Sequence, residues 1–256
     1  IGIASGLLGI GGGTVMVPIF RLAFGMSATV STATSLFAII PTSISGAISH
    51  VKGKTCIPAL GIAAGLGGAC LSPVGVWLAQ LSPDWLVMLA AALIIGYSAI
   101  NMFKKAFKLR PAGQPAAGVD AAAPTADDSS LSRKQLLQGA AIGLVAGLAS
   151  GYVGVGGGFI MVPLMLSIIG IPMRKASGTS LIAVMILAIP GVIEQGIIGN
   201  INYLAGIAIV IGTIPGAVIG ARLVTKVPER TLRLLFGCFL IVAAVMLVLN
   251  EVGIFG

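Results

Sequence analysis

Six long apolar runs constrain the fold of this chain more than any other feature of its sequence. Each run is about as long as the 17–25 residues that cross the hydrocarbon core of a bilayer as an α-helix. Only 9% of the 256 residues are charged and the mean hydropathy is +1.10, whereas soluble domains carry about a quarter of charged residues. The sequence therefore predicts an all-α polytopic membrane protein. The runs cover 27–49, 57–81, 85–103, 176–197, 203–224 and 232–249.

A glycine-rich segment occurs twice in the chain. It reads GLLGIGGGTVMVP at 6–18 and GYVGVGGGFIMVP at 151–163, an offset of 145 residues. At this offset ten of the eighteen positions in 3–20 are identical to those in 148–165. The pair Thr34 and Ser35 recurs at the same offset as Thr179 and Ser180. The chain is therefore predicted to be an internal duplication of two membrane repeats.

The segment 108–132, between the repeats, is rich in Pro, Ala, Gly and acidic residues and has almost no side chains that could build a core. This composition predicts a flexible cytoplasmic linker. The first membrane repeat is expected over 1–107 and the second over 133–256. Because the chain opens at Ile1 inside an apolar segment and without a methionine, we expect the natural protein to carry further residues before it.

The basic residues indicate how the repeats cross the membrane, since short cytoplasmic loops carry the excess of Lys and Arg. If the linker is cytoplasmic, one spanning helix at 135–171 would place Arg174, Lys175 and the later basic residues outside. A re-entrant hairpin that breaks at the glycines places all of them inside. Each repeat then holds one hairpin plus three transmembrane helices, and this odd number of crossings requires inverted topology. The net charge of +8 therefore indicates topology and not nucleic-acid binding.

The glycine breaks are expected to form two hairpin tips that meet near the membrane midplane. Irregular backbone at that depth must be buried in protein or line a cavity. The helix that starts at each tip points free N–H groups into it, and a helix start favours anions without any Arg or Lys. The tips therefore predict an anion site. Its candidate residues are Gly11, Gly12, Gly13 and Thr14 in the first tip and Gly156, Gly157 and Gly158 in the second.

Close helix packing is an alternative role for the tip glycines. A dinucleotide-binding fingerprint is excluded because Thr14 and Phe159 stand where the pattern needs glycine. We expect packing at a second set of glycines, whose four-residue spacing suits helix contacts: Gly61, Gly65, Gly212, Gly216 and Gly220.

The duplicated Thr-Ser pairs lie in the first helix after each hairpin, where their hydroxyls could complete the hydrogen bonds of an anion. Bonding of each hydroxyl to its own helix carbonyl is the open alternative. Glu194 is the one carboxylate inside an apolar run and is a possible coupling residue, although a water-exposed place near the external helix end explains it equally well. The lone histidine, His50, is expected at the membrane interface. No metal site or cofactor is expected, because the three cysteines are scattered singly.

The paired GIGGG…VP and GVGGG…VP segments, the duplication and the ATS and GTS helices resemble the sulfite exporter TauE/SafE family, also called the toluene sulfonate uptake permease family. The resemblance covers the whole chain except the linker. It implies a multi-pass carrier in a bacterial inner membrane or archaeal plasma membrane. The implied partners are the lipid bilayer and a small sulfur oxyanion or organosulfonate, such as sulfite, thiosulfate or sulfoacetate. It does not choose between import and export, and the oligomeric state stays open.

The physical prediction agrees with this substrate class, because a sulfite or sulfonate presents three oxygens that only accept hydrogen bonds. A passive anion channel, or a carrier of another small carboxylate or inorganic anion, stays an alternative. An intramembrane serine hydrolase built on Ser5 or Ser150 is not expected, because the lone histidine lies near a helix end. Import of a divalent anion against the membrane potential needs a coupling cation, so export or uniport is expected.

Overall fold

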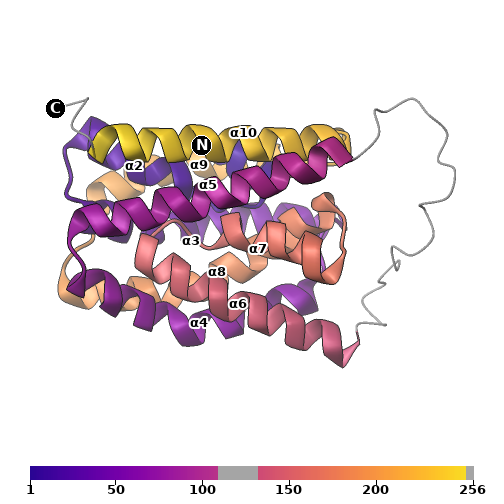
Figure 1. Cartoon of the computed structure of the whole chain (residues 1–256), viewed down its shortest axis with the longest axis horizontal. Helices are drawn as coiled ribbons and strands as arrows, with labels where there is room; N and C mark the ends of the chain where they lie inside the picture. Colours follow the sequence, from indigo (N-terminus) through magenta and orange to yellow (C-terminus); the bar gives the residue numbers. More distant parts are fainter. Residues whose placement is uncertain (109–131, 252–256) are drawn as a thin grey trace, which may run out of the picture.

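The computed structural model describes residues 1–108 and 132–251, so the expected linker lies almost wholly outside the described residues. Every regular element that it describes is helical, as the composition predicts (Figure 1). The elements are α1 (Gly2–Leu8), α2 (Gly13–Phe24), α3 (Ala28–Lys52), α4 (Pro58–Leu81), α5 (Asp84–Lys108), α6 (Arg133–Val153), α7 (Gly158–Leu164), the π-helical turn η1 (Met165–Ile169), α8 (Met173–Ile198), α9 (Tyr203–Leu223) and α10 (Glu229–Glu251).

Corresponding helices of the two halves begin 145 residues apart, which is the offset of the sequence duplication. The duplicated sequence therefore specifies duplicated local structure. The matched starts are Gly13 and Gly158, Ala28 and Met173, Pro58 and Tyr203, and Asp84 and Glu229.

Six helices are long and apolar enough to cross a membrane, namely α3, α4, α5, α6, α8 and α9. Five of them coincide with expected runs. The sixth, α6, was expected as a hairpin arm, but its 21 residues correspond to about 31 Å of helix. The expected run 232–249 lies in α10, which is not among the six found in the described residues. The second hairpin arms are shorter, Gly13–Phe24 and Gly158–Ile169.

The two halves exchange their first hairpin arms. Helix α6 of the second half lies along α4 of the first, and α1 lies along α9 of the second. A Cβ atom on Gly143 would collide with the carbonyl oxygen of Ala64, and one on Gly220 with that of Ile3. Because glycine lets helix backbones touch, the α4–α6 and α1–α9 contacts are the closest helix contacts of the bundle.

The expected packing role of the spaced glycines is confirmed at four positions. In α4, a Cβ on Gly61 would lie 2.9 Å from Cβ of Ile182 and one on Gly65 2.7 Å from Cβ of Ile186, both in α8. In α9, Gly216 and Gly220 lie against the backbone of α1. The expectation is wrong for Gly212, which is exposed and has no atom within 4 Å of its Cβ position.

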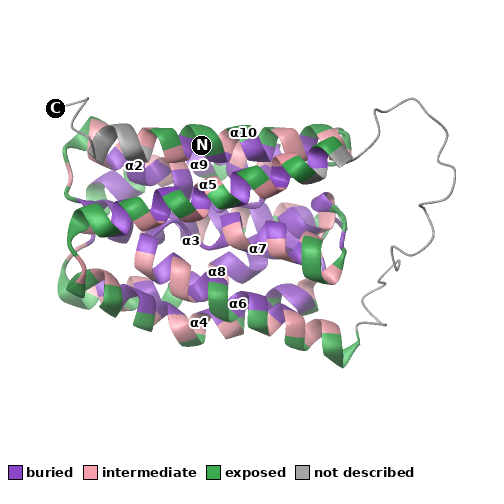
Figure 2. Cartoon of the chain, in the orientation of Figure 1, coloured by how far each residue is buried: buried purple, intermediate pink, exposed green. Residues whose placement is uncertain are grey.

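Helices α3 and α8 contact each other and carry long buried stretches through the middle of the bundle (Figure 2). The outward surface is apolar, since side chains such as Leu204 and Ile211 are 83% and 71% exposed. An apolar outer surface on helices of this length suits hydrocarbon as the surrounding solvent.

Basic residues from both halves meet at one end of the bundle. Lys52, the last residue of α3, and Arg222, near the end of α9, line one pocket. The start of α8 lies at the same end, because a Cβ on Gly178 would be 2.8 Å from Nδ1 of His50 near the end of α3. We call this the basic end. This clustering of basic residues at one end of the bundle agrees with the re-entrant hairpins that the distribution of Lys and Arg predicts.

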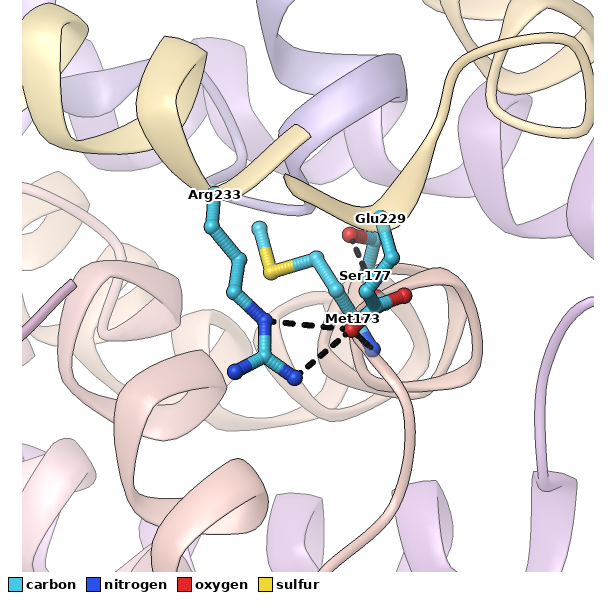
Figure 3. A network of polar contacts seen from close by, with 4 residues as sticks. All are labelled: Met173, Ser177, Glu229 and Arg233. Carbon is cyan, nitrogen blue, oxygen red and sulfur yellow. Dashed lines mark hydrogen bonds and ion pairs between the residues drawn. The ribbon is translucent and has the colours of Figure 1, made fainter. Parts of the chain in front are cut away.

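Glu229, at the start of α10, forms a hydrogen bond to the start of α8 at the basic end (Figure 3). Its Oε1 accepts a hydrogen bond from the Met173 N–H at 2.7 Å and pairs with Arg233 at 2.8 Å. In Figure 1, α10 begins at the end of the bundle where α5 ends and α6 begins, and it finishes at the opposite end. Helices α5 and α10 therefore run in opposite directions. The inverted topology of the repeats and their orientation in the bilayer stay predictions.

His50 lies two residues before the end of α3, and its predicted depth at the membrane interface stays a prediction. Its side chain is fully buried, with Nε2 2.8 Å from the carbonyl oxygen of Gly6 and Nδ1 2.7 Å from Oγ1 of Thr55. The ring therefore ties α1 to the segment between α3 and α4. The position near a helix end did not indicate burial, because α1 covers it only in the tertiary structure.

Cysteine labelling tests the orientation on a background without Cys56, Cys70 and Cys238. We expect Asn200→Cys to react with an impermeant maleimide in intact cells. Lys54→Cys and Lys226→Cys should react only after permeabilisation, because basic loops stay in the cytoplasm. Labelling of Lys226→Cys from outside, with Lys54→Cys protected, would favour parallel repeats instead.

Candidate functional site

Each hairpin breaks at a run of glycines in left-handed backbone conformation. In the first tip, Gly9, Gly11 and Gly12 have φ of 75°, 80° and 87°. Their counterparts 145 residues later, at 154, 156 and 157, have φ of 72°, 90° and 63°. L-residues rarely adopt these angles, so the duplicated glycines are required by the turn itself. The new helices start at Gly13 and Gly158, as the sequence predicts.

The two tips touch each other through their backbones. A Cβ on Gly13 would collide with the carbonyl group of Val155, and one on Gly158 with the carbonyl oxygen of Gly9. The side chains of Ile39 and Val184, from α3 and α8, approach the Cβ position of Gly11 to 3.2 and 3.0 Å. All residues of 9–14 and 153–159 are buried. The tips therefore meet in the interior of the bundle, shielded from solvent.

The lengths of the second arms are consistent with tips near half depth. Each arm has twelve residues, Gly13–Phe24 and Gly158–Ile169, and so extends for about 18 Å. The hydrocarbon core is about 30 Å thick, so one such arm leads from a surface to a little beyond its middle.

Backbone N–H groups at the tips lack an acceptor among the described residues. In the first tip the N–H groups of Val15 and Met16 both bond to the carbonyl of Gly12 at 3.2 Å, and those before them do not. A buried N–H without a partner costs about 1–3 kcal/mol, so such groups are usually satisfied in the working protein. These free donors belong to Gly11, Gly12, Gly13 and Thr14 in the first tip and to Gly156, Gly157 and Phe159 in the second.

Two serine hydroxyls at the tips also lack a partner among the described residues. Ser5 and Ser150 are buried counterparts, and neither Oγ makes a hydrogen bond. The Cβ of Ser5 lies 3.5 Å from the Cβ position of Gly12, and that of Ser150 lies 3.4 Å from the Cβ position of Gly157. Sequence reasoning considered both serines only as nucleophiles. The duplicated Ala-Ser-Gly before each break was the signal that links them to the tips.

Two more unpaired hydroxyls belong to one half only. Thr14 Oγ1 is buried without a partner, and its counterpart is Phe159. Ser43 Oγ, also unpaired, lies 3.4 Å from the Cβ position of Gly11, and the residue 145 positions later is Ala188. The first tip is therefore the richer in free donors.

The duplicated threonines link the two halves. Thr34 Oγ1 accepts a hydrogen bond from the Asn202 N–H at 3.0 Å, and Thr179 Oγ1 accepts one from the Ile57 N–H at 2.9 Å. Each threonine thus contacts the residue just before α9 or α4 of the other half. Among the described residues, neither oxygen bonds to a carbonyl of its own helix, and the predicted contact with an anion stays a prediction.

The duplicated serines differ from each other. Ser180 Oγ lies 2.7 Å from the carbonyl oxygen of Gly9 and 2.8 Å from that of Ser177, so it supports the first tip and also bonds within its helix. Ser35 is buried and its hydroxyl has no partner among the described residues. Of the four hydroxyls of the Thr-Ser pairs, that of Ser35 is therefore uncommitted.

A family model described as Sulfite exporter TauE/SafE matches residues 1–247. The chain belongs to the sulfite exporter TauE/SafE family. This confirms the resemblance drawn from the glycine motifs, and it makes the protein a multi-pass membrane transporter of the cell membrane.

Several bacterial relatives named as probable membrane transporter proteins align with this TauE/SafE family chain over most of their length. YunE of Bacillus subtilis is 28% identical over 99% of this chain and 95% of its own. YdhB of the same organism is 27% identical over 91% and 90%. A protein of Haemophilus influenzae is 28% identical over 97% and 94%. No solved structure matches the chain.

Glu194 lies in the last two turns of α8 in this TauE/SafE chain, away from the tips. Its side chain is partly exposed, and its Oε2 atom is buried without a partner among the described residues. The structure therefore does not bring Glu194 to the anion site, and its predicted role in coupling stays a prediction. The described residues contain no group of three or more side chains that could hold a metal ion.

Proposed function

We propose that this TauE/SafE family chain is a secondary carrier of small sulfur-containing anions, such as sulfite, thiosulfate or an organosulfonate like sulfoacetate. The anion binds near the midplane between the two glycine tips. The observation that carries the proposal is the meeting of two helix starts in the buried interior, each with backbone N–H groups that have no acceptor among the described residues.

The donors suit this substrate class. A sulfite or sulfonate group has three oxygens that accept hydrogen bonds and donate none. The free N–H groups of Gly12, Gly13 and Thr14 and the hydroxyls of Ser5 and Ser150 are donors. Hydrogen bonds from such groups to an anion contribute about 1.5–3 kcal/mol each, and the positive ends of two helix dipoles add to them. A bound anion would also satisfy groups that are otherwise costly to bury.

A carrier mechanism is favoured over a passive channel because both tips are buried, so that an anion between them has no open path to either surface. In transporters built from repeats, one half rocks against the other around a fixed site. The exchanged arms α1 and α6 would couple each tip to the opposite half during such a motion. Export or uniport is the proposed direction, because import of a divalent anion costs about 2.3 kcal/mol per charge per 100 mV.

Counterflow of [35S]sulfite into proteoliposomes tests the function. We expect saturable uptake driven by internal unlabelled sulfite. The double variant Ser5→Ala/Ser150→Ala should take up sulfite roughly 100-fold more slowly at low concentration, since each lost hydroxyl removes about 1.5 kcal/mol of anion binding. Ser82→Ala is the control, because its hydroxyl lies at a helix end away from the buried tips, where it donates to the Leu78 carbonyl and accepts from the Tyr152 hydroxyl.

Two results would contradict the proposal. Linear uptake without counterflow would assign the protein to the passive anion channels. Saturable counterflow of a carboxylate or of chloride, with none of sulfite, thiosulfate or sulfonates, would move the substrate to another class of small anion. Equal uptake rates for the serine double variant and Ser82→Ala would mean that the Ser5 and Ser150 hydroxyls do not bind the anion.

A further inference from the structure

The pocket at the basic end opens between α3 of the first half and α9 of the second. Its volume is about 540 Å³, ample for a small oxyanion with water. The pocket is separate from the glycine tips and shares no residue with them. Its walls include Ser45, Ser49, Lys52, Val218, Arg222 and Thr225.

The charge in this pocket comes from Lys52 and Arg222. Both side chains are exposed, and neither has a carboxylate partner within the described part of the chain. The wall hydroxyls are already engaged, since Ser45 and Ser49 donate to carbonyls of their own helix at 2.8 and 3.1 Å. The two cations are therefore the uncommitted donors, and the guanidinium fork suits two oxygens of one oxyanion.

The corresponding seam of the duplicated fold, between α8 and α4, does not carry these charges. The residues at the 145-residue offset are Ile197 in place of Lys52 and Trp77 in place of Arg222. Glu194 stands in place of Ser49. The duplication therefore repeats the pair of helices and does not repeat the charge between them. A positive pocket on one side only favours collection of anions from that side.

Helix α3 extends from the wall of this pocket to the tips. Less than one turn from Ser45 of the pocket wall, Thr42 Oγ1 lies 2.7 Å from Oγ1 of Thr213 in α9 and closes the seam. The next residue, Ser43, lies beside Gly11 of the first tip. From Lys52 to Ser43 the helix rises by about 14 Å. The Thr42–Thr213 contact thus stands between the pocket and the tips.

We propose that this pocket is a capture site for the transported anion, in which Lys52 and Arg222 hold a sulfur oxyanion before it passes the Thr42–Thr213 contact. This inference rests on the proposed anion transport. The positive-inside rule also places basic residues at this end, but it depends on their number in the loops and not on their place in a pocket wall. A variant that removes equal charge outside the pocket separates the two explanations.

Kinetics of [35S]sulfite uptake into phosphatidylcholine proteoliposomes, loaded from the basic end at low ionic strength, provide the test. For Lys52→Gln/Arg222→Gln we expect KM to rise roughly tenfold while kcat stays within about twofold, because the charges concentrate the anion and take no part in the later step. The difference should shrink at 0.5 M salt, where charges are screened within a few Å.

The control is Lys226→Gln/Lys54→Gln, which removes the same charge from exposed positions at this end that do not line the pocket. It should leave KM nearly unchanged. Equal KM values for the pocket variant and the control would overturn the capture site. Because the tip variants are measured in the same assay, loss of transport in those variants alone would leave the proposed function standing.

A lipid phosphate presents the same oxyanion chemistry, so the assay is repeated with phosphatidylglycerol. A free anion as the occupant predicts that the tenfold difference in KM persists in both lipids. If the headgroup occupies the pocket, phosphatidylglycerol should raise the KM of the native protein to that of the pocket variant. A lipid adduct in native mass spectra that disappears in Lys52→Gln/Arg222→Gln would then identify the headgroup and overturn capture of the substrate.

Discussion

Gly157→Val is expected to abolish sulfite binding, with a loss of at least about 100-fold, while the protein still inserts into the membrane. Gly157 precedes α7 with φ of 63°, and its Cβ position lies 3.1 Å from the carbonyl oxygen of Ala146 and 3.4 Å from Cβ of Ser150. A branched side chain there must move the helix start and the Ser150 hydroxyl together. Anion binding through main-chain donors depends on that geometry. The measurement is the sulfite-induced shift in melting temperature of the purified variant.

Gly170→Val is the matched control for this change. Gly170 has φ of 78°, so a side chain there carries the same kind of backbone strain, about 1–2 kcal/mol. Nothing lies within 4 Å of its Cβ position, and it is outside the tips. We expect Gly170→Val to lose stability and keep its sulfite-induced shift. Gly157→Ala gives a graded second variant should valine prevent folding. If well-folded Gly157→Val keeps the native sulfite-induced shift in melting temperature, the anion does not bind at the tips. Packing would then be the role of the tip glycines.

Gly220→Val is expected to lower stability by about 3 kcal/mol or more, the largest effect on the fold that we predict. A Cβ there would collide with the carbonyl oxygen of Ile3 and lie 2.8 Å from the amide nitrogen of Leu7, so α9 and α1 would have to separate. The apparent melting temperature in detergent should fall by roughly 6–12 °C.

Gly212→Val, eight residues earlier on the same helix, is the control. Gly212 is exposed and has open space around its Cβ position. Valine is no worse than glycine in a helix, so we expect a melting temperature within about 2 °C of the native protein. Equal melting temperatures for the two variants would mean that the α1–α9 seam contributes little to stability.

The sequence alone was sufficient for the helical fold and for the place of the two breaks. Runs of membrane length can satisfy their backbone groups in lipid only as helices. The glycines of the breaks are distinctive because their left-handed conformations exclude other residues, as the φ of 75° at Gly9 and 72° at Gly154 illustrate. The repeat at one offset predicted that both breaks have the same form, and both new helices start where the motif indicates, at Gly13 and Gly158.

The contacts between halves could not be predicted in the same way. Thr34 and Thr179 resemble residues that bond to their own helix, yet each accepts a hydrogen bond from the other half. His50 stands near a helix end with polar neighbours, and it is buried because α1 lies over it. Such partners are distant in sequence, and no local pattern encodes which surface will cover a given side chain.

The amino-acid sequence by itself determined which segments are helical and where the two hairpins break. These properties depend on backbone angles and on hydropathy, which are local. Only the tertiary structure decided that α1 and α6 are exchanged between the halves and that the two tips meet in the buried interior. The tertiary structure also distinguished Gly220, which packs against α1, from Gly212, which is exposed. The sequence alone does not show whether a small residue in a membrane helix faces another helix or lipid.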